Sequence, residues 1–300
     1  MNSSSTSLLS FFLATIIFGL VAPATADTDN GVCTPTADYC WSCSGDTTNA
    51  TTTYEVNLKA LLASLSLVNQ TNYEFYHNSL GDGTNKVNAI AMCRGDIAEN
   101  DCRSCYTAAS VILSQNCSNQ HQAVIWAINC TVRYSNMSIF GIEEDEPTKF
   151  VPSPNNTSNL EQFKQVLNPL LKTLSEKAAS GDSMKKFAAG HELVPGTNQT
   201  IYAIVQCSPD LDKENCTGCL DDAISDISNS TIDGKDGGRI LKPSCSFRFE
   251  NNRFYDLAVD SLPPAPSPTQ GNTTSITTKV SPSSFFQLLL SLLCISSALF

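Results

Sequence analysis

The feature that most constrains this chain is a cysteine pattern that occurs twice. Cysteines spaced C-x8-C-x2-C lie at residues 93–105 and again at 207–219, and each cysteine of the second set follows its counterpart by 114 residues. Two later cysteines, Cys130 and Cys245, are separated by 115 residues. The flanks also agree, since Ala-Ile-Ala-Met-Cys in the first set corresponds to Ala-Ile-Val-Gln-Cys in the second. A period this long indicates the duplication of a whole domain rather than a solenoid repeat.

The rest of the sequence divides around this duplication. The chain has 300 residues, of which 41% are hydrophobic, and this is enough for two packed cores. Residues 142–156 are acidic and then rich in Pro and Asn, which is typical of a linker. We therefore expect a first domain over residues 27–141 and a second over residues 157–260.

Hydrophobic periodicity predicts similar elements in both copies. Apolar residues recur at helical spacing over 58–65 and 163–174, and a second helix is expected after each C-x2-C pair, at 103–116 and 217–229. Strands are expected at 87–93, 123–129 and 131–135 in the first copy and at 200–207, 239–242 and 246–250 in the second. Two helices on one face of an antiparallel sheet, an α+β fold, is the natural packing for each copy.

Cysteine counting indicates disulfides. One of the 13 cysteines, Cys294, lies in an apolar tail that we expect to be removed, which leaves an even number. The second copy lacks counterparts of Cys117 and of the upstream cysteines, and two cysteines lost together indicate a bond between them, Cys43–Cys117. The four cysteines that both copies keep must pair among themselves, and the short loop between the first two can close as a bridge. The other expected pairs are Cys93–Cys102, Cys105–Cys130, Cys207–Cys216, Cys219–Cys245 and, as the remaining two, Cys33–Cys40.

The N-terminus has the pattern of a secretory signal. An apolar run at residues 8–21 precedes Ala24-Thr25-Ala26, which matches a signal-peptidase site, so residues 1–26 are expected to form a signal peptide. The usual basic segment before the run is missing, which leaves an uncleaved anchor as the alternative. Candidate N-glycosylation sites also favour secretion; they are Asn49, Asn69, Asn136 and Asn198.

The C-terminus has the pattern of a lipid-attachment signal. Residues 261–284 form a stalk rich in Pro, Ser and Thr, and residues 285–300 form an apolar tail without a basic flank. Small residues, a polar spacer and a terminal apolar tail are typical of a glycosylphosphatidylinositol (GPI) signal. Asn272 is the expected attachment site, with Ser275 and Gly271 as alternatives. A short membrane helix or plain secretion is the alternative for the tail as a whole.

The residues capable of chemistry form no recognisable motif for catalysis or metal binding. The C-x2-C pairs can hold zinc, but secretion and the disulfide-like spacing favour structural bridges. Cys40-Trp-Ser-Cys43 has the spacing of a redox dithiol without the surroundings of a thioredoxin site. No nucleophile motif such as G-x-S-x-G stands beside the histidines. We expect no catalytic residues, no metal and no cofactor. A net charge of −11 also argues against nucleic acid as a partner.

The duplicated pattern resembles the plant family of ginkbilobin-homologous domains. The supporting stretches are MCRGDIAENDCRSC at 92–105, RYSNMSIFG at 133–141 and GKDGGRILKPSC at 234–245. The arrangement is similar to that of cysteine-rich repeat secretory proteins, plasmodesmata-located proteins and the ectodomains of cysteine-rich receptor-like kinases. The resemblance implies two tandem domains, each with two helices on a five-stranded antiparallel sheet. No kinase sequence occurs in these 300 residues, so we expect the likeness to receptor-like kinases to concern their ectodomains.

The resemblance also implies a candidate sugar site. A single-domain member of the family binds mannose through an Asn, an Arg and a Glu. The first copy has Ser44, Val124 and Ser135 at these positions and should not bind sugar in this way. The second copy has Arg239 and Glu250, whereas the Asn cannot be placed. These two side chains could bind sugar hydroxyls or, as the alternative, form a structural salt bridge.

These observations predict a non-enzymatic extracellular binding protein that recognises a cell-wall glycan or an extracellular protein. It is expected at the outer face of the plasma membrane with a GPI anchor, or free in the apoplast. Two alternatives remain open. One is a plasmodesmatal membrane protein that regulates movement between cells, and the other is a secreted mannose-binding antifungal protein.

Overall fold

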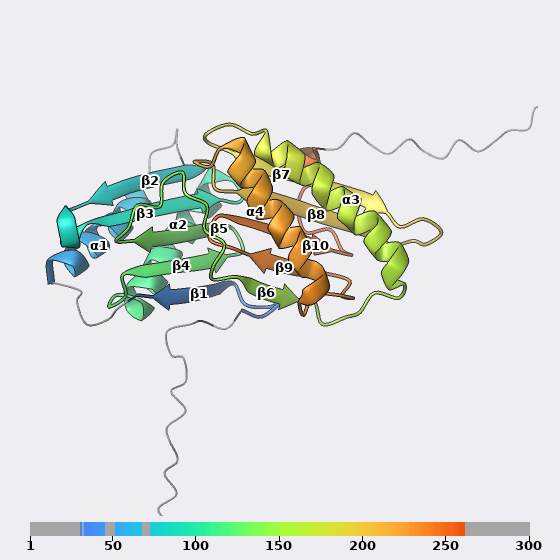
Figure 1. Cartoon of the computed structure of the whole chain (residues 1–300), viewed down its shortest axis with the longest axis horizontal. Helices are drawn as coiled ribbons and strands as arrows, with labels where there is room; N and C mark the ends of the chain where they lie inside the picture. Colours follow the sequence, from blue (N-terminus) through green and yellow to red (C-terminus); the bar gives the residue numbers. More distant parts are fainter. Residues whose placement is uncertain (1–30, 32, 46–51, 68–72, 262–300) are drawn as a thin grey trace, which may run out of the picture. The chain divides into compact units, whose positions relative to one another are not determined.

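The computed structural model describes residue 31 and residues 33–45, 52–67 and 73–261 (Figure 1). The expected signal peptide, the GPI signal with Asn272, and the candidate glycosylation sites Asn49 and Asn69 lie outside these residues. Within the described part of the chain, none of the helices combines the length and apolar character needed to cross a membrane.

The first domain is an antiparallel sheet of five strands with two helices. Its elements in chain order are β1 (Tyr39–Ser44), α1 (Thr52–Ser64), β2 (Phe75–Leu80), β3 (Val87–Cys93), α2 (Glu99–Asn116), β4 (Gln122–Ala127) and β5 (Cys130–Ser135). The strand order is β1-β4-β5-β3-β2, and every neighbouring pair is antiparallel. Two short 3₁₀ turns, Leu65–Leu67 and Gly83–Asn85, complete it.

The second domain repeats this arrangement. Its elements are β6 (Lys149–Pro152), α3 (Leu160–Ala179), β7 (Lys186–Leu193), β8 (Thr200–Cys207), α4 (Lys213–Asp226), β9 (Gly238–Leu241) and β10 (Cys245–Glu250), with 3₁₀ turns at Ile227–Asn229 and Leu257–Val259. The order β6-β9-β10-β8-β7 matches that of the first sheet position by position. The predicted α+β fold, with two tandem domains of two helices on five antiparallel strands, is confirmed.

Each core lies between the helices and one face of the sheet. In the second domain, α3 presents Phe163, Leu167 and Leu174 to Phe247 and Phe249 of β10, and all of these side chains are buried. Figure 1 shows α3 and α4 lying across this sheet. Because side chains alternate along a strand, the neighbouring residues of β8, β9 and β10 project from the face without helices.

Six disulfides are formed among the described residues, four within the first domain and two within the second. The structure forms Cys33–Cys40, Cys43–Cys117, Cys93–Cys102, Cys105–Cys130, Cys207–Cys216 and Cys219–Cys245. These are the pairs that the comparison of the two copies predicts. The two cysteines of each C-x2-C pair bond to different partners, so each second helix is tied to two strands of its sheet.

The linker prediction needs correction. Residues 142–156 include β6, which pairs with β9 as the edge strand of the second sheet, so this domain begins before residue 157. Val151 is buried in that strand, but a single inward apolar residue among Pro, Lys and Asn gives too weak a strand signal. The periodicity also missed β2 and β7. Five of the six residues of β2 lie in contact with solvent to some degree, and β7 is rich in Ala and Gly.

Candidate functional site

The two domains contact each other through side chains that project away from the helices. Trp126 of β4 is buried, and its indole Nε1 donates a hydrogen bond to the carbonyl oxygen of Lys242 at 3.0 Å. Gln206 of β8 bridges to the end of β3: its amide donates to the carbonyl of Cys93 at 2.6 Å and accepts from the N–H of Gly95 at 3.2 Å. Trp126 and Gln206, which donate from the first and the second domain respectively, are both buried, so these bonds fix the contact.

The segment between the domains is also fixed. Arg133 of β5 has a side chain that is 3% exposed, and its Nη1 lies 2.6 Å from a carboxylate oxygen of Glu144. The N–H of Glu144 donates to the hydroxyl of Ser244 in the second domain at 2.7 Å. Burial lowers the pKa of Arg133, and the nearby carboxylates of Glu144 and Asp210 oppose that effect. An acidic residue of the linker thus neutralises a buried cation of the first sheet.

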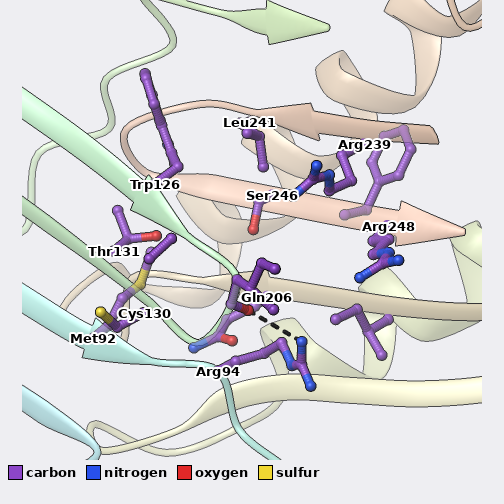
Figure 2. Close-up of a pocket in the computed structure, with 14 residues that line it drawn as sticks. Met92, Arg94, Trp126, Cys130, Thr131, Gln206, Arg239, Leu241, Ser246 and Arg248 are labelled. Carbon is purple, nitrogen blue, oxygen red and sulfur yellow. Dashed lines mark hydrogen bonds between the residues drawn. The ribbon is translucent and has the colours of Figure 1, made fainter. Parts of the chain in front are cut away.

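A cavity of about 60 Å³ lies between the two domains (Figure 2). The lining side chains include Arg94, Trp126 and Thr131 from the first domain and Arg239, Ser246 and Arg248 from the second. Arg239 and Arg248 face each other on the neighbouring strands β9 and β10. Three guanidinium groups are therefore brought to one hollow in a chain of net charge −11.

Arg239 is held by backbone carbonyls rather than by a carboxylate. Its Nη2 donates to the carbonyl oxygens of Thr34 at 3.0 Å and Pro35 at 3.3 Å, in the segment before β1. Burial lowers the pKa of Arg239, the positive charge of Arg248 lowers it further, and Glu250 opposes both effects. Arg239 thus keeps its charge in a setting that disfavours it.

Glu250 lies on the same face of the sheet as Arg239 but bonds to another residue. Arg248 Nε donates to Glu250 Oε1 at 2.9 Å, and the Arg248 guanidinium lies 4.3 Å from the ring centre of Phe254. The structure therefore places Arg239 and Glu250 near each other without joining them. The salt bridge considered as the alternative is formed by Glu250 and Arg248 instead.

The corresponding positions of the first copy lie in a second hollow that the linker covers. Ser44, Val124 and Ser135 line it together with Glu144 and Pro147. Val124 and Ser135 are buried. The linker segment that contains Glu144 and Pro147 therefore covers this side of the first sheet.

Sequence reasoning missed three contributors to the cavity: Arg94, Gln206 and Arg248. A signal was present for two of them. Arg248 corresponds to Arg133 in the aligned stretches after Cys130 and Cys245, so both copies keep a charge in a buried strand. Gln206 is a polar residue in an apolar strand, where the first copy has Met92. The contact that Gln206 makes with the first domain could not be read from either copy alone.

One group of potential metal ligands occurs among the described residues, formed by Glu143, Asp145 and Cys219. The sulfur of Cys219 is bonded to Cys245, which leaves two carboxylates. Burial and the neighbouring carboxylates of Asp145 and Asp222 raise the pKa of Glu143. A pair of carboxylates without a further ligand has no distinct preference for a metal.

Comparison with known proteins agrees with this architecture. The family described as salt stress response/antifungal matches residues 39–137 and 151–252. The chain belongs to this family. Both matched stretches coincide with the domains of the structure, so the family domain, also called DUF26, occurs here in tandem.

The chain is similar to secreted proteins and to receptor ectodomains. It is 38% identical to cysteine-rich repeat secretory protein 38 of Arabidopsis thaliana, over 68% of this chain and 80% of that one. It is 34% identical to an antimicrobial ginkbilobin-2-like protein of Castanea crenata, over 74% of this chain and 89% of that one. It is also 36% identical to cysteine-rich receptor-like protein kinase 29 of Arabidopsis thaliana, over 73% of this chain, and it spans about a third of that kinase's length (32%).

A solved structure supports the fold. The tandem DUF26 ectodomain of the Arabidopsis thaliana cysteine-rich receptor-like protein PDLP8 superposes with a TM-score of 0.57. The match covers 70% of this chain and 96% of that one, at 19% identity. The chain is thus a cysteine-rich tandem DUF26 protein related to secreted and ectodomain proteins.

Proposed function

We propose that this protein is a non-enzymatic extracellular binding protein that recognises a cell-wall carbohydrate in the cavity between its two domains. The observation that carries the proposal is the donor set of that cavity. Arg239 presents guanidinium donors to it, and the hydroxyls of Thr131 and Ser246 line it beside the indole of Trp126. Charged donors, hydroxyls and an aromatic wall are the groups that bind the hydroxyls and the apolar face of a sugar.

The surroundings of the histidines support a binding role rather than catalysis. His77 packs against Phe140 with the ring centres 5.3 Å apart, and His121 packs against Tyr54 at 5.0 Å. His191 bonds to Asp260, with Nδ1 2.6 Å from the carboxylate. The 12 cysteines of the two domains are all engaged in disulfides. Nucleophilic catalysis requires a hydroxyl or thiol activated by a nearby base, and these histidines serve other contacts.

The extracellular setting is part of the proposal. Six disulfides are stable in an oxidising compartment, which fits passage through the secretory pathway. Asn198 lies exposed in the turn between β7 and β8, where a glycan could be attached. The proposed anchor is GPI at Asn272, with plain secretion or a plasmodesmatal membrane as the alternatives.

A glycan array tests the proposal. The full chain, expressed in a plant secretory host and purified with its disulfides intact, should bind at least one class of cell-wall glycan. Arg239→Gln should weaken that binding, because it removes the charge from the cavity while keeping hydrogen-bonding capacity. Absence of binding to every glycan, or a variant that binds as tightly as the native chain, would contradict the proposal.

A further inference from the structure

The charges around the cavity do not cancel. Arg94 is paired with Asp96, whose two carboxylate oxygens accept from Nε at 2.6 Å and Nη2 at 2.9 Å. Arg248 is paired with Glu250. Within the described ranges, no carboxylate lies within ion-pair distance of Arg239. One positive charge of the cavity is therefore left without an ion-pair partner among the described residues.

Arg239 also has donors to spare. A guanidinium has five N–H donors, and both bonds that Arg239 makes to described residues start from Nη2. Its Nε and Nη1 make none within the same part of the chain. Burial and the charge of Arg248 act against the cationic form of Arg239, so a bound anion would relieve both effects.

In both domains the arginine of the last strand is paired with a carboxylate of the same chain. Arg133 of β5 stands three residues after Cys130, just as Arg248 of β10 stands three residues after Cys245. The segment after β5 turns back over its own sheet and delivers the carboxylate of Glu144 to Arg133. This face of the fold therefore accommodates a carboxylate beside an arginine, with Glu144 beside Arg133 in the first domain and Glu250 beside Arg248 in the second.

Arg239 of β9, which corresponds to Val124 in the first copy, forms no ion pair with a carboxylate among the described residues. The residues after β10 run toward β7 and β8, where Asp260 forms a bridge with Ala189 and bonds to His191 and Tyr255. Asp256, the other acidic residue of this segment, accepts a hydrogen bond from the N–H of Ala258, so both carboxylates are engaged away from Arg239. The described residues thus bring no carboxylate to Arg239, which leaves this cation open to an anionic group of a ligand.

The size of the cavity and its hydroxyls restrict the ligand. A volume of about 60 Å³ holds roughly four to six water molecules, which suits a carboxylate and the ring atoms next to it. The hydroxyls of Thr131 and Ser246 line the cavity and make no hydrogen bond within the described residues. We propose that Arg239 binds the carboxylate of a hexuronate unit in an acidic cell-wall polysaccharide, while these hydroxyls bind its ring substituents. The inference rests on the proposed function and specifies its ligand.

A titration with matched oligosaccharides tests the charge requirement on the native chain. The probes are a galacturonate oligomer and the same oligomer with its carboxylates methyl-esterified, measured by calorimetry at low and at physiological salt. We expect the esterified probe to bind roughly 10- to 100-fold more weakly, because it loses a charge-assisted hydrogen bond. Equal affinities for the two probes would overturn the inference. An oligomer of glutamate that binds as tightly as the galacturonate would overturn it too, since charge alone would then suffice.

A pair of variants locates the site. Arg239→Gln should lose the preference for the charged probe, whereas Arg253→Gln, which removes an exposed arginine outside the cavity, should keep it. Unchanged thermal unfolding of both variants would exclude a folding defect. Equal losses in both variants would contradict the assignment to Arg239. Binding of neutral glycans without binding of galacturonate would refute this inference and leave the proposed function standing, whereas absence of all glycan binding would refute both.

Discussion

The bond between Arg133 and Glu144 allows a sharp test of how the two domains are held. Glu144→Gln removes the carboxylate from a cation whose side chain is 3% exposed, while the amide keeps a similar size. Breaking a buried ion pair from one side costs about 3–5 kcal/mol. The side chain of Glu144 is itself 36% exposed, so water replaces part of the lost interaction. We therefore expect a loss of about 2 kcal/mol in the free energy of unfolding, which corresponds to a fall in Tm of roughly 4–8 °C for a protein of this size.

The assay is urea unfolding followed by tryptophan fluorescence with the disulfides intact. The chain has two tryptophans, and one of them, Trp126, lies at the contact between the domains. Glu146→Gln is the matched control, since it removes the same charge from an exposed linker residue. In an Arg133→Met background, Glu144→Gln should cost no more than about 0.5 kcal/mol, because the cation is gone. If Glu144→Gln destabilises the native chain no more than Glu146→Gln does, then the ion pair does not hold the linker and the reasoning fails.

Three further predictions follow from the features described above. Phosphatidylinositol-specific phospholipase C should release the protein from plant membranes, and recovery of residues 280–300 in the mature protein would exclude a GPI anchor. If mannose binds by the family's route, Arg239→Ala should abolish binding, whereas Val124→Ala at the matching position of the first copy should leave it unchanged; equal losses would remove Arg239 from the sugar site. Burial raises the pKa of Tyr106 and Tyr134 above the usual value of 10.0, so the unfolded chain loses these protons first and stability should fall as the pH rises above about 10. Urea midpoints measured at pH 8 and pH 10.5 check this sign, and an unchanged midpoint would contradict it.

The fold was largely predictable because the sequence contains two copies of one domain, which can be compared with each other. Cysteines that both copies keep, and cysteines that only one copy has, separate the possible disulfide partners without any structure. The helices were predictable from the spacing of residues such as Leu167 and Leu174. The edge strands β2, β6 and β7 were not: β2 and β6 each bury a single residue, and β7 buries mostly Ala and Gly, so none of them shows a clear apolar alternation.

The candidate site was predictable only in part. Arg239 does lie in a cavity on the side of the sheet without helices, at the position that the family resemblance indicates. Its expected companion Glu250 is bonded to Arg248 instead. The sequence cannot show whether Glu250 pairs with Arg248 on its own strand or with Arg239 on the neighbouring strand, because both arginines lie on the same face of the sheet. The other wall of the cavity, with Arg94 and Trp126, comes from the first domain. The periodicity within one copy contains no information about which residues meet across two copies.

The bridge made by Gln206 has a consequence for how this chain can change. Its amide binds the backbone of the first copy at Cys93 and Gly95, whereas the first copy has Met92 at the equivalent position. A chain made of two second copies would place an amide on both sides of the contact, and a chain made of two first copies would leave those backbone groups without their partner. The two domains are therefore not interchangeable, because each has the side chains for only one side of the contact. Recombination that exchanges or repeats a half should yield a protein whose domains no longer fit together.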